Sequence, residues 1–136
     1  MRTRTKIKGA QAKRMKRSDC PLSCTLDLIG DRWSLLIVRD LLFGRSRYSE
    51  LAAAGEGIPT NILAQRLKQL EQGGIIERRP SAKPRSRYDY CLTKAGLKLA
   101  PAVRVLAEWG HSEIAGTRPL PLRARRRRPK IAPIPA

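Results

Sequence analysis

The chain has 136 residues, which is the size of one domain with a hydrophobic core, and a formal net charge of +18 at pH 7. No run of about 18 apolar residues occurs, so we expect no membrane span. The three cysteines are too few, and odd in number, for a disulfide scaffold, so we expect a reducing cytoplasm.

The positive charge is concentrated at the two ends. Residues 1–17 contain eight Lys or Arg and residues 118–130 contain seven more, with no acid in either stretch. All 11 acids lie in residues 18–117 beside 14 bases, so this middle stretch has a net charge of only +3. The sequence therefore predicts a folded domain at residues 18–116 between two disordered basic ends, residues 1–17 and 117–136.

Basic ends without acids bind polyanions by releasing condensed counterions, with little sequence preference. The single sign of the charge favours nucleic acid as the partner. Two alternatives stay open: both ends as merely solubilising segments, and the Arg-rich start as an organelle transit peptide. A secretory signal is not expected, because no apolar segment follows the basic start.

Three helices are predicted in the first part of the middle stretch. The first begins after Ser18 and Asp19 and ends at Gly30, and the second begins after Asp31, which can cap it, and ends at Gly44. The third is short, over residues 48–53. Apolar residues recur at helical spacing in the first two helices: Leu22, Leu26 and Ile29, then Trp33, Leu36, Ile37 and Leu41.

A longer helix is predicted over residues 58–72, with Thr60 as its N-cap and Gly73-Gly74 at its end. On a helical wheel Leu63, Leu67 and Leu70 lie within about 60° of one another, so they form the packed side. This leaves the opposite side of the helix to polar residues.

That opposite side presents Asn61, Gln65 and Lys68, with Thr60 at its start. Asn and Gln amides can hydrogen-bond to base edges in the major groove, and a Lys ammonium can bind guanine or phosphate. An ordinary polar outer face is the alternative, so the segments that follow decide between the two.

A β-hairpin is predicted next, with one strand after Ile75 and the other ending at Leu92. Its turn end carries three cations, Lys83, Arg85 and Arg87. Helices, a turn, a polar-faced helix and a basic hairpin together make a winged helix-turn-helix. In that arrangement the helix enters the major groove and the hairpin lies on the backbone or the minor groove.

A further helical region is expected after Thr93, which can cap it, and its apolar residues recur as far as Trp109. Pro101 lies within this region, so we expect a break or kink there.

A series of motifs extends in order from Cys20 to Gly110. They are Cys20-Pro21, Leu26-Asp27-Leu28-Ile29-Gly30, Arg32-Trp33, Arg39-Asp40-Leu41, Arg47-Tyr48-Ser49-Glu50-Leu51, Gly57-Ile58, Arg66-Leu67, Leu70-Glu71, Gly74-Ile75, Tyr88, Tyr90, Leu92-Thr93 and Trp109-Gly110. In this order the chain resembles the HxlR-type winged helix-turn-helix regulators, relatives of the MarR-like repressors. Asp31 departs from the family pattern, as do Ala52-Ala53-Ala54 and the Arg-rich extension from Arg118.

The resemblance implies a mainly α fold with a small β-hairpin, in the α+β class. It also implies a homodimer, built from the N-terminal helix and the helices after Thr93, that binds an inverted repeat in double-stranded DNA. Two-fold proteins of this kind read half-sites about one helical turn, or 10 bp, apart.

Cys20 aligns with the Cys-Pro of the family, in which several members use that cysteine to sense oxidants or electrophiles. A helix start and the nearby Lys16 and Arg17 would stabilise its thiolate. The alternative is a small buried residue at a helix start. Cys24 lies one turn further and is a candidate resolving thiol, whereas Cys91 is expected to be buried and inert.

The leading hypothesis is a nucleoid-associated transcriptional regulator that uses Thr60, Asn61, Gln65 and Lys68 for bases and Lys83, Arg85 and Arg87 for the backbone or minor groove. An oxidant or small-molecule effector is possible. The alternative is a non-specific architectural or RNA-associated protein. An enzyme is not expected, because no catalytic triad, carboxylate pair or phosphate loop occurs. No cofactor is implied, and the cysteines and His111 lack the spacing of a metal site.

Overall fold

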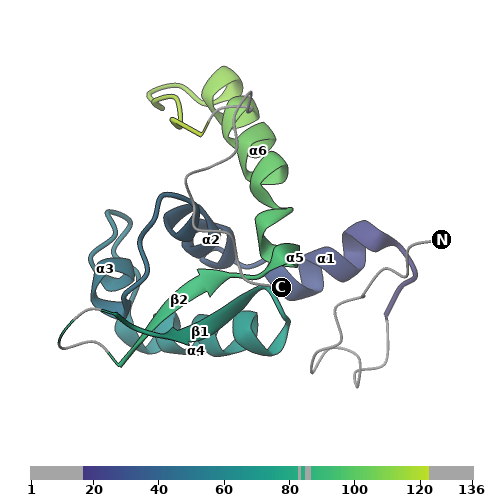
Figure 1. Ribbon diagram of the computed structural model, residues 1–136. Helices are drawn as coiled ribbons and strands as arrows, with labels where there is room; N and C mark the ends of the chain where they lie inside the picture. Colours follow the sequence, from purple (N-terminus) through teal and green to yellow (C-terminus); the bar gives the residue numbers. More distant parts are fainter. Residues whose placement is uncertain (1–16, 83, 85–86, 123–136) are drawn as a thin grey trace.

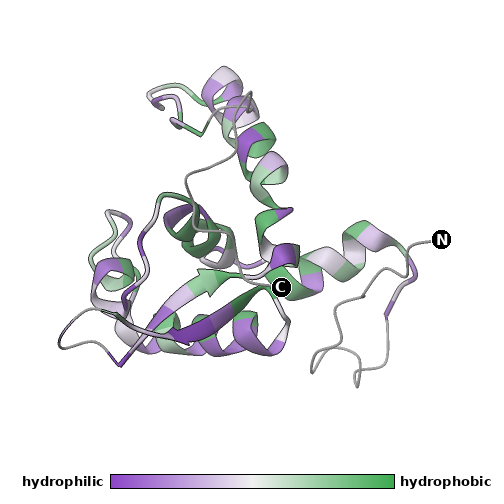
Figure 2. Ribbon diagram, viewed as in Figure 1, coloured by the Kyte–Doolittle hydropathy of each residue, from purple (hydrophilic) through white to green (hydrophobic). Residues whose placement is uncertain are grey.

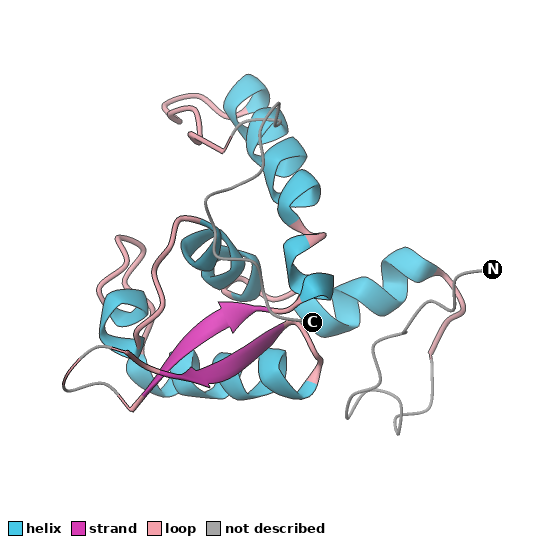
Figure 3. Cartoon of the chain, in the orientation of Figure 1, coloured by secondary structure: helices cyan, strands magenta, loops and turns pink. Residues whose placement is uncertain are grey.

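The computed structural model describes residues 17–82, 84 and 87–122. Most of the two predicted basic ends therefore lies outside the described residues. Figures 1 and 3 show the helices and strands in order, which are α1 (Pro21–Ile29), α2 (Ser34–Leu42), α3 (Tyr48–Ala52), α4 (Thr60–Gln72), β1 (Ile76–Pro80), β2 (Tyr88–Leu92), α5 (Lys94–Leu97) and α6 (Ala100–Glu113). The predicted fold class, mainly α with one β-hairpin, is confirmed.

The core is built where α2, α4 and the hairpin meet. Val38 of α2 is fully buried, as are Leu63 and Leu70 of α4, and Ile76 of β1 is 1% exposed. Each fully buried aliphatic side chain contributes about 1.5–3 kcal/mol by leaving water. The other buried hydrophobic residues are Ile29, Ile37, Leu41, Leu42, Leu51, Ile58, Leu67, Ile75, Tyr90, Leu92 and Val103.

α4 begins one position away from the prediction. Pro59, not Thr60, occupies the N-cap position, because its backbone is extended (ψ 140°), and Thr60 is the first helical residue. The Thr60 hydroxyl makes no capping hydrogen bond. The predicted end is confirmed: Gly73 is the C-cap, and Gly74 adopts a φ of 76°, which favours glycine.

The hairpin is antiparallel, and its register pairs Ile76 with Leu92 and Pro80 with Tyr88. Thr93 follows β2 and caps α5 as predicted, since its hydroxyl oxygen accepts a hydrogen bond from the Gly96 amide at 3.1 Å. The same hydroxyl donates to the Gly74 carbonyl at 2.6 Å. The end of the hairpin is thereby tied to the turn that follows α4.

The C-terminal helical region breaks just before Pro101. α5 ends at Leu97, and Pro101 lies in the first turn of α6, where its missing N–H costs nothing. Figure 1 shows α6 projecting away from the body formed by α2, α4 and the hairpin. After α6 the chain turns back toward the body. Leu120 and Leu122 are half-buried and pack against the core.

Candidate nucleic-acid interface

The outer side of α4 is exposed and polar. Thr60, Asn61, Gln65 and Lys68 are all exposed, while the three leucines on the other side of α4 are at most 2% exposed. The structure therefore places Asn61, Gln65 and Lys68 on the side of α4 opposite the leucines, with Thr60 exposed at the N-terminal end of the helix. Figure 2 shows hydrophilic residues along α4 and β1, in contrast to the hydrophobic α2.

Gln72 was missed by the sequence interpretation. It is exposed, and its helical position is about 200° from Leu70, on the same side as Gln65. Extending the helical wheel by one turn would have found it. Gln69 is also exposed, but its side-chain oxygen accepts a hydrogen bond from Arg66 at 2.6 Å.

Two polar contacts position α4. The Tyr48 hydroxyl of α3 donates to the Thr60 carbonyl at 2.9 Å and fixes the start of the helix. Asp31, in the turn before α2, forms an ion pair with Arg66 at 3.1 Å. Because both contacts reach α4 from other elements, the polar face is held in a fixed orientation.

Asp31 is the centre of this second contact. Its carboxylate accepts hydrogen bonds from the amides of Trp33 and Ser34 at 3.0 Å and from the Ser34 hydroxyl. Partial burial acts to raise the pKa of Asp31, but these hydrogen bonds and the charge of Arg66 outweigh it and lower the pKa below its ordinary value. Trp33, not Asp31, occupies the N-cap position of α2, but the Asp31 carboxylate binds the amides at the start of this helix and holds α4 as well.

The hairpin is joined to the far end of α4. Arg78 of β1 donates to Glu71 at 2.7 Å, and its guanidinium lies 5.0 Å from the centre of the Tyr88 ring. Tyr88 and Tyr90 are two residues apart on one face of β2, and their rings make an edge-to-face contact at 5.5 Å. Burial, helped by the neighbouring Tyr88 hydroxyl, raises the pKa of Tyr90 to about 12.

Of the three predicted wing cations, Arg87 lies immediately before β2 and is exposed. Lys83 and Arg85 lie outside the described residues. Arg78 is an additional exposed cation on the hairpin, with half of its side chain accessible. The sequence interpretation missed it, because it considered cations only at the turn end.

The family model described as HxlR-like helix-turn-helix matches residues 28–117. The chain belongs to this family. The HTH-type transcriptional regulator Rv3095 of Mycobacterium tuberculosis is 42% identical over 85 residues, which are 62% of this chain and 53% of that protein. The chain thus spans about half the length of this relative. Members are transcriptional regulators with a helix-turn-helix DNA-binding fold, not enzymes.

Two solved structures agree with the family. The crystal structure of PA1607 matches with a TM-score of 0.67 and 31% identity, over 82% of this chain and 86% of that one. The redox regulator HypR in its reduced form matches with a TM-score of 0.62 and 31% identity, over 68% of this chain and 92% of that one. The likeness supports a winged helix-turn-helix.

The cysteines of this HxlR-like protein differ in exposure. Cys20 is exposed at the N-cap position of α1, which removes the alternative of a buried residue at a helix start. Cys24 is half-buried, and its thiol donates to the Ser18 carbonyl at 3.3 Å. Cys91 is half-buried, and burial raises the pKa of its thiol.

The expected positive charge beside Cys20 is partly compensated. Arg17 forms an ion pair with Asp27 at 2.7 Å, so its guanidinium does not act on Cys20 alone. Lys16 lies outside the described residues. Across the part of the chain that the structure describes, no three Cys, His, Asp or Glu side chains gather as they would around a metal ion.

The HxlR-like chain also exposes apolar side chains on α1 and α6. Trp109 is 63% exposed and Leu22 is 65% exposed. Large apolar side chains left exposed in this number are typical of a protein interface. The others on these two helices and just after α6 are Leu26, Val105, Leu106 and Ile114.

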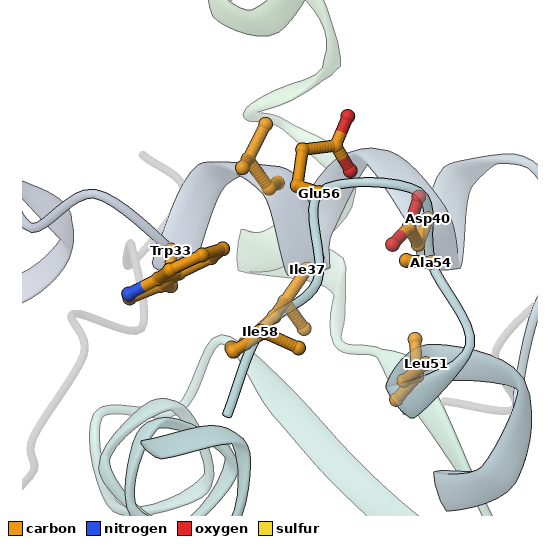
Figure 4. Close-up of a pocket in the computed structure, with 8 residues that line it drawn as sticks. Trp33, Ile37, Asp40, Leu51, Ala54, Glu56 and Ile58 are labelled. Carbon is orange, nitrogen blue, oxygen red and sulfur yellow. The ribbon is translucent and has the colours of Figure 1, made fainter. Parts of the chain in front are cut away.

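A small cavity lies between α2 and the segment that joins α3 to α4 (Figure 4). Trp33, Ile37 and Ile58 form its apolar walls, and its volume of about 10 Å³ corresponds to roughly one water molecule. A cavity of this size is too small for an organic effector. Beside it Arg39 pairs with both Asp40, at 3.0 Å, and Glu56, at 2.6 Å.

No helix in the described ranges has the length and apolar character that crossing a membrane requires.

Proposed function

We propose that this HxlR-like protein is a homodimeric transcriptional regulator that reads an inverted-repeat operator through Thr60, Asn61, Gln65 and Lys68 of α4. The observation that carries the proposal is the division of α4 into a buried leucine side and an exposed polar side. Exposed amides on a helix of this kind can form bidentate hydrogen bonds with adenine in the major groove.

The hairpin holds the DNA backbone or the minor groove beside α4. Arg87 is exposed immediately before β2, and Lys83 and Arg85 precede it in the sequence. Ion pairing of Arg78 with Glu71 fixes the hairpin relative to α4. The helix and the wing therefore approach DNA as one unit.

The dimer forms through α1 and α6. Leu22 and Leu26 of α1 and Leu106 and Trp109 of α6 are each more than half exposed, and a second copy of the chain would cover them. A two-fold dimer places its recognition helices in successive turns of the major groove, so we expect half-sites about 10 bp apart.

Cys20 responds to oxidants or electrophiles in this proposal. Two findings support it: Cys20 is exposed at the start of α1, and the structure resembles that of HypR, a redox regulator. Cys24 is one turn away, so a disulfide between the two within one chain would constrain little. A bridge from Cys20 to the second subunit would constrain the dimer much more.

The test is selection of bound sites from a random DNA pool at about 150 mM salt, an ionic strength at which exposed charges beyond about 8 Å are screened. Reduced protein is expected to enrich an inverted repeat. Mild oxidation is expected to abolish the enrichment, reductant to restore it, and Cys20→Ser to remove the response. An inverted repeat that is enriched equally before and after oxidation would contradict the sensing role of Cys20. The proposal of an inverted-repeat operator would still hold.

The basic ends, residues 1–17 and 117–136, favour a second candidate, a non-specific architectural or RNA-associated protein. If that candidate is correct, the selection enriches no motif, and binding is salt-sensitive on every sequence. In the leading proposal the ends add contacts of equal strength on all sequences, so their deletion weakens operator and random DNA alike.

A further inference from the structure

We propose that Asp89 of β2 and Arg47, at the start of α3, form a buried charge pair that fixes the hairpin against the helix-turn-helix. In this role Asp89 is a positioning residue. It does not bind DNA itself, but it sets where the hairpin meets the DNA. The inference rests on the proposed function, because the contact that it positions is the contact of the hairpin with DNA.

Asp89 and Arg47 lie in neighbouring extended segments. The Tyr90 amide of β2 donates to the Ser46 carbonyl at 2.7 Å and so joins β2 to the segment before α3. Asp89 precedes Tyr90 and Arg47 follows Ser46, so each is one residue away from this hydrogen bond. The backbone of Arg47 is itself extended, with φ −92° and ψ 148°. Extended segments joined by a backbone hydrogen bond lie about 5 Å apart, which an arginine side chain can span.

Each of the two side chains has a buried polar atom that makes no hydrogen bond. These atoms are Nε of Arg47 and Oδ1 of Asp89. The third such atom among the described residues is Nε of Arg66, which already has the Asp31 carboxylate at 3.1 Å. The two atoms that remain belong to a cation and an anion. Because buried polar groups without a partner are rare in native structures, we assign these two groups to each other.

The other cation next to Asp89 is already engaged. Arg79 of β1 is paired with Asp89 in the hairpin register, but its Nε donates to Glu77 at 2.8 Å. Between Arg47 and Asp89 the structure records no direct ion pair. The two charges therefore attract each other across a short gap, where burial lowers the dielectric and strengthens the attraction.

The pair with Arg47 holds the face of the hairpin that α4 does not hold. On one face Arg78, which pairs with Tyr90 in the register, reaches Glu71 of α4 at 2.7 Å. Neighbouring residues of a strand point to opposite faces, so Asp89 lies on the other face. The hairpin is thus fixed to α4 on one face and to the start of α3 on the other.

The first test is a double-mutant cycle on stability, with Arg47→Gln, Asp89→Asn and both together, measured by chemical denaturation at one protein concentration. Each single variant leaves one buried charge unpaired, whereas the double variant removes both. Asp89→Asn is expected to raise the unfolding equilibrium constant about tenfold in wild type and less than about twofold in the Arg47→Gln background. Equal effects in the two backgrounds would overturn the pair. If a single variant does not fold, the double variant is still expected to fold, and its failure to do so would overturn the pair as well.

The second test separates positioning from charge. Removing a carboxylate from a surface beside DNA strengthens binding if charge alone matters, since DNA is an anion. Positioning predicts the opposite. Asp89→Asn is expected to bind both the selected operator and a mixed-sequence duplex more weakly, with a salt slope that falls by about 0.9 for each phosphate that the hairpin no longer contacts. Asp89→Glu, which keeps the charge, is expected to retain the wild-type slope.

Glu77→Gln is the matched control, because it removes a carboxylate from the same face of the hairpin. It is expected to bind DNA at least as tightly as wild type. Asp89→Asn protein that binds as tightly as the Glu77→Gln protein would overturn the positioning role. If the wild-type protein selects no operator, the proposed function fails, and the stability cycle still decides whether Asp89 and Arg47 pair.

Discussion

One carboxylate oxygen of Asp31 lies 3.1 Å from Nε of Arg66 and joins the turn before α2 to the middle of α4. The same oxygen accepts the amides of Trp33 and Ser34. Asp31, one of the departures from the family pattern, therefore orients α4 from the turn before α2.

Replacing Asp31 with Ala is expected to lower the free energy of unfolding by about 1–2 kcal/mol, because the cap of α2 is lost and Arg66 loses its partner. Chemical denaturation of the reduced protein measures the change. Asp19→Ala is the matched control, since Asp19 is exposed before α1. Equal effects of the two substitutions would mean that the Asp31 contacts contribute nothing to stability.

The lowered pKa of Asp31 predicts a loss of stability in acid. Because the pKa is lower in the folded chain than in the unfolded chain, the unfolded chain binds the proton more readily. The stabilisation is present above the ordinary pKa of 3.8 and is lost as the pH falls through the lower folded value. Melting temperatures below the ordinary pKa of Asp31 should fall less steeply for Asp31→Asn than for wild type. Parallel curves would assign the acid sensitivity to other carboxylates, such as Glu56, whose pKa is lowered by its hydrogen bond from Arg39.

Gln65→Ala is expected to weaken operator binding by about 1–3 kcal/mol and to relax the preference at one base position. Binding to random DNA should change little, because base contacts carry specificity and phosphate contacts do not. Gln69→Ala is the control and should have little effect, because the Gln69 side-chain oxygen already accepts a hydrogen bond from Arg66. Titrations on operator and random duplexes measure both variants. Equal losses of affinity on the operator and random duplexes would show that Gln65 does not contact bases.

Trp109→Asp is expected to convert the dimer to a monomer without unfolding it, since the side chain is 63% exposed in the single chain. Sedimentation velocity measures the oligomeric state, and circular dichroism measures the fold. His111→Asp is the control, because His111 is exposed about 200° around α6 from Trp109. A Trp109→Asp protein that remains dimeric would place the interface elsewhere.

The helix α4 could be predicted because its signals are local. Leu63, Leu67 and Leu70 repeat at helical spacing, and two glycines follow. Thr93 was likewise predicted as a cap from the residues next to it. Helix-forming patterns and caps depend on neighbours within about one turn, which a sequence shows directly.

Contacts between distant residues could not be predicted in the same way. Nothing in the sequence pairs Asp31 with Arg66, or the Ser46 carbonyl with the Tyr90 amide, because each contact depends on how α2, α4 and β2 pack. The ion pair of Arg78 with Glu71 depends on the same packing. Sequence periodicity identified the polar face of α4, whereas the residues that orient this face required the fold.

The contact between α1 and α4 would affect how far apart the two α4 helices lie in a dimer built on α1. Gly73, at the end of α4, lies so close to α1 that a Cβ atom there would come within 2.5 Å of the Leu28 side chain. If α1 forms part of the dimer interface, this contact sets how far apart the two recognition helices lie. A larger side chain at position 73 would then change the separation of half-sites that the dimer accepts, and the bases read within each half-site would stay the same.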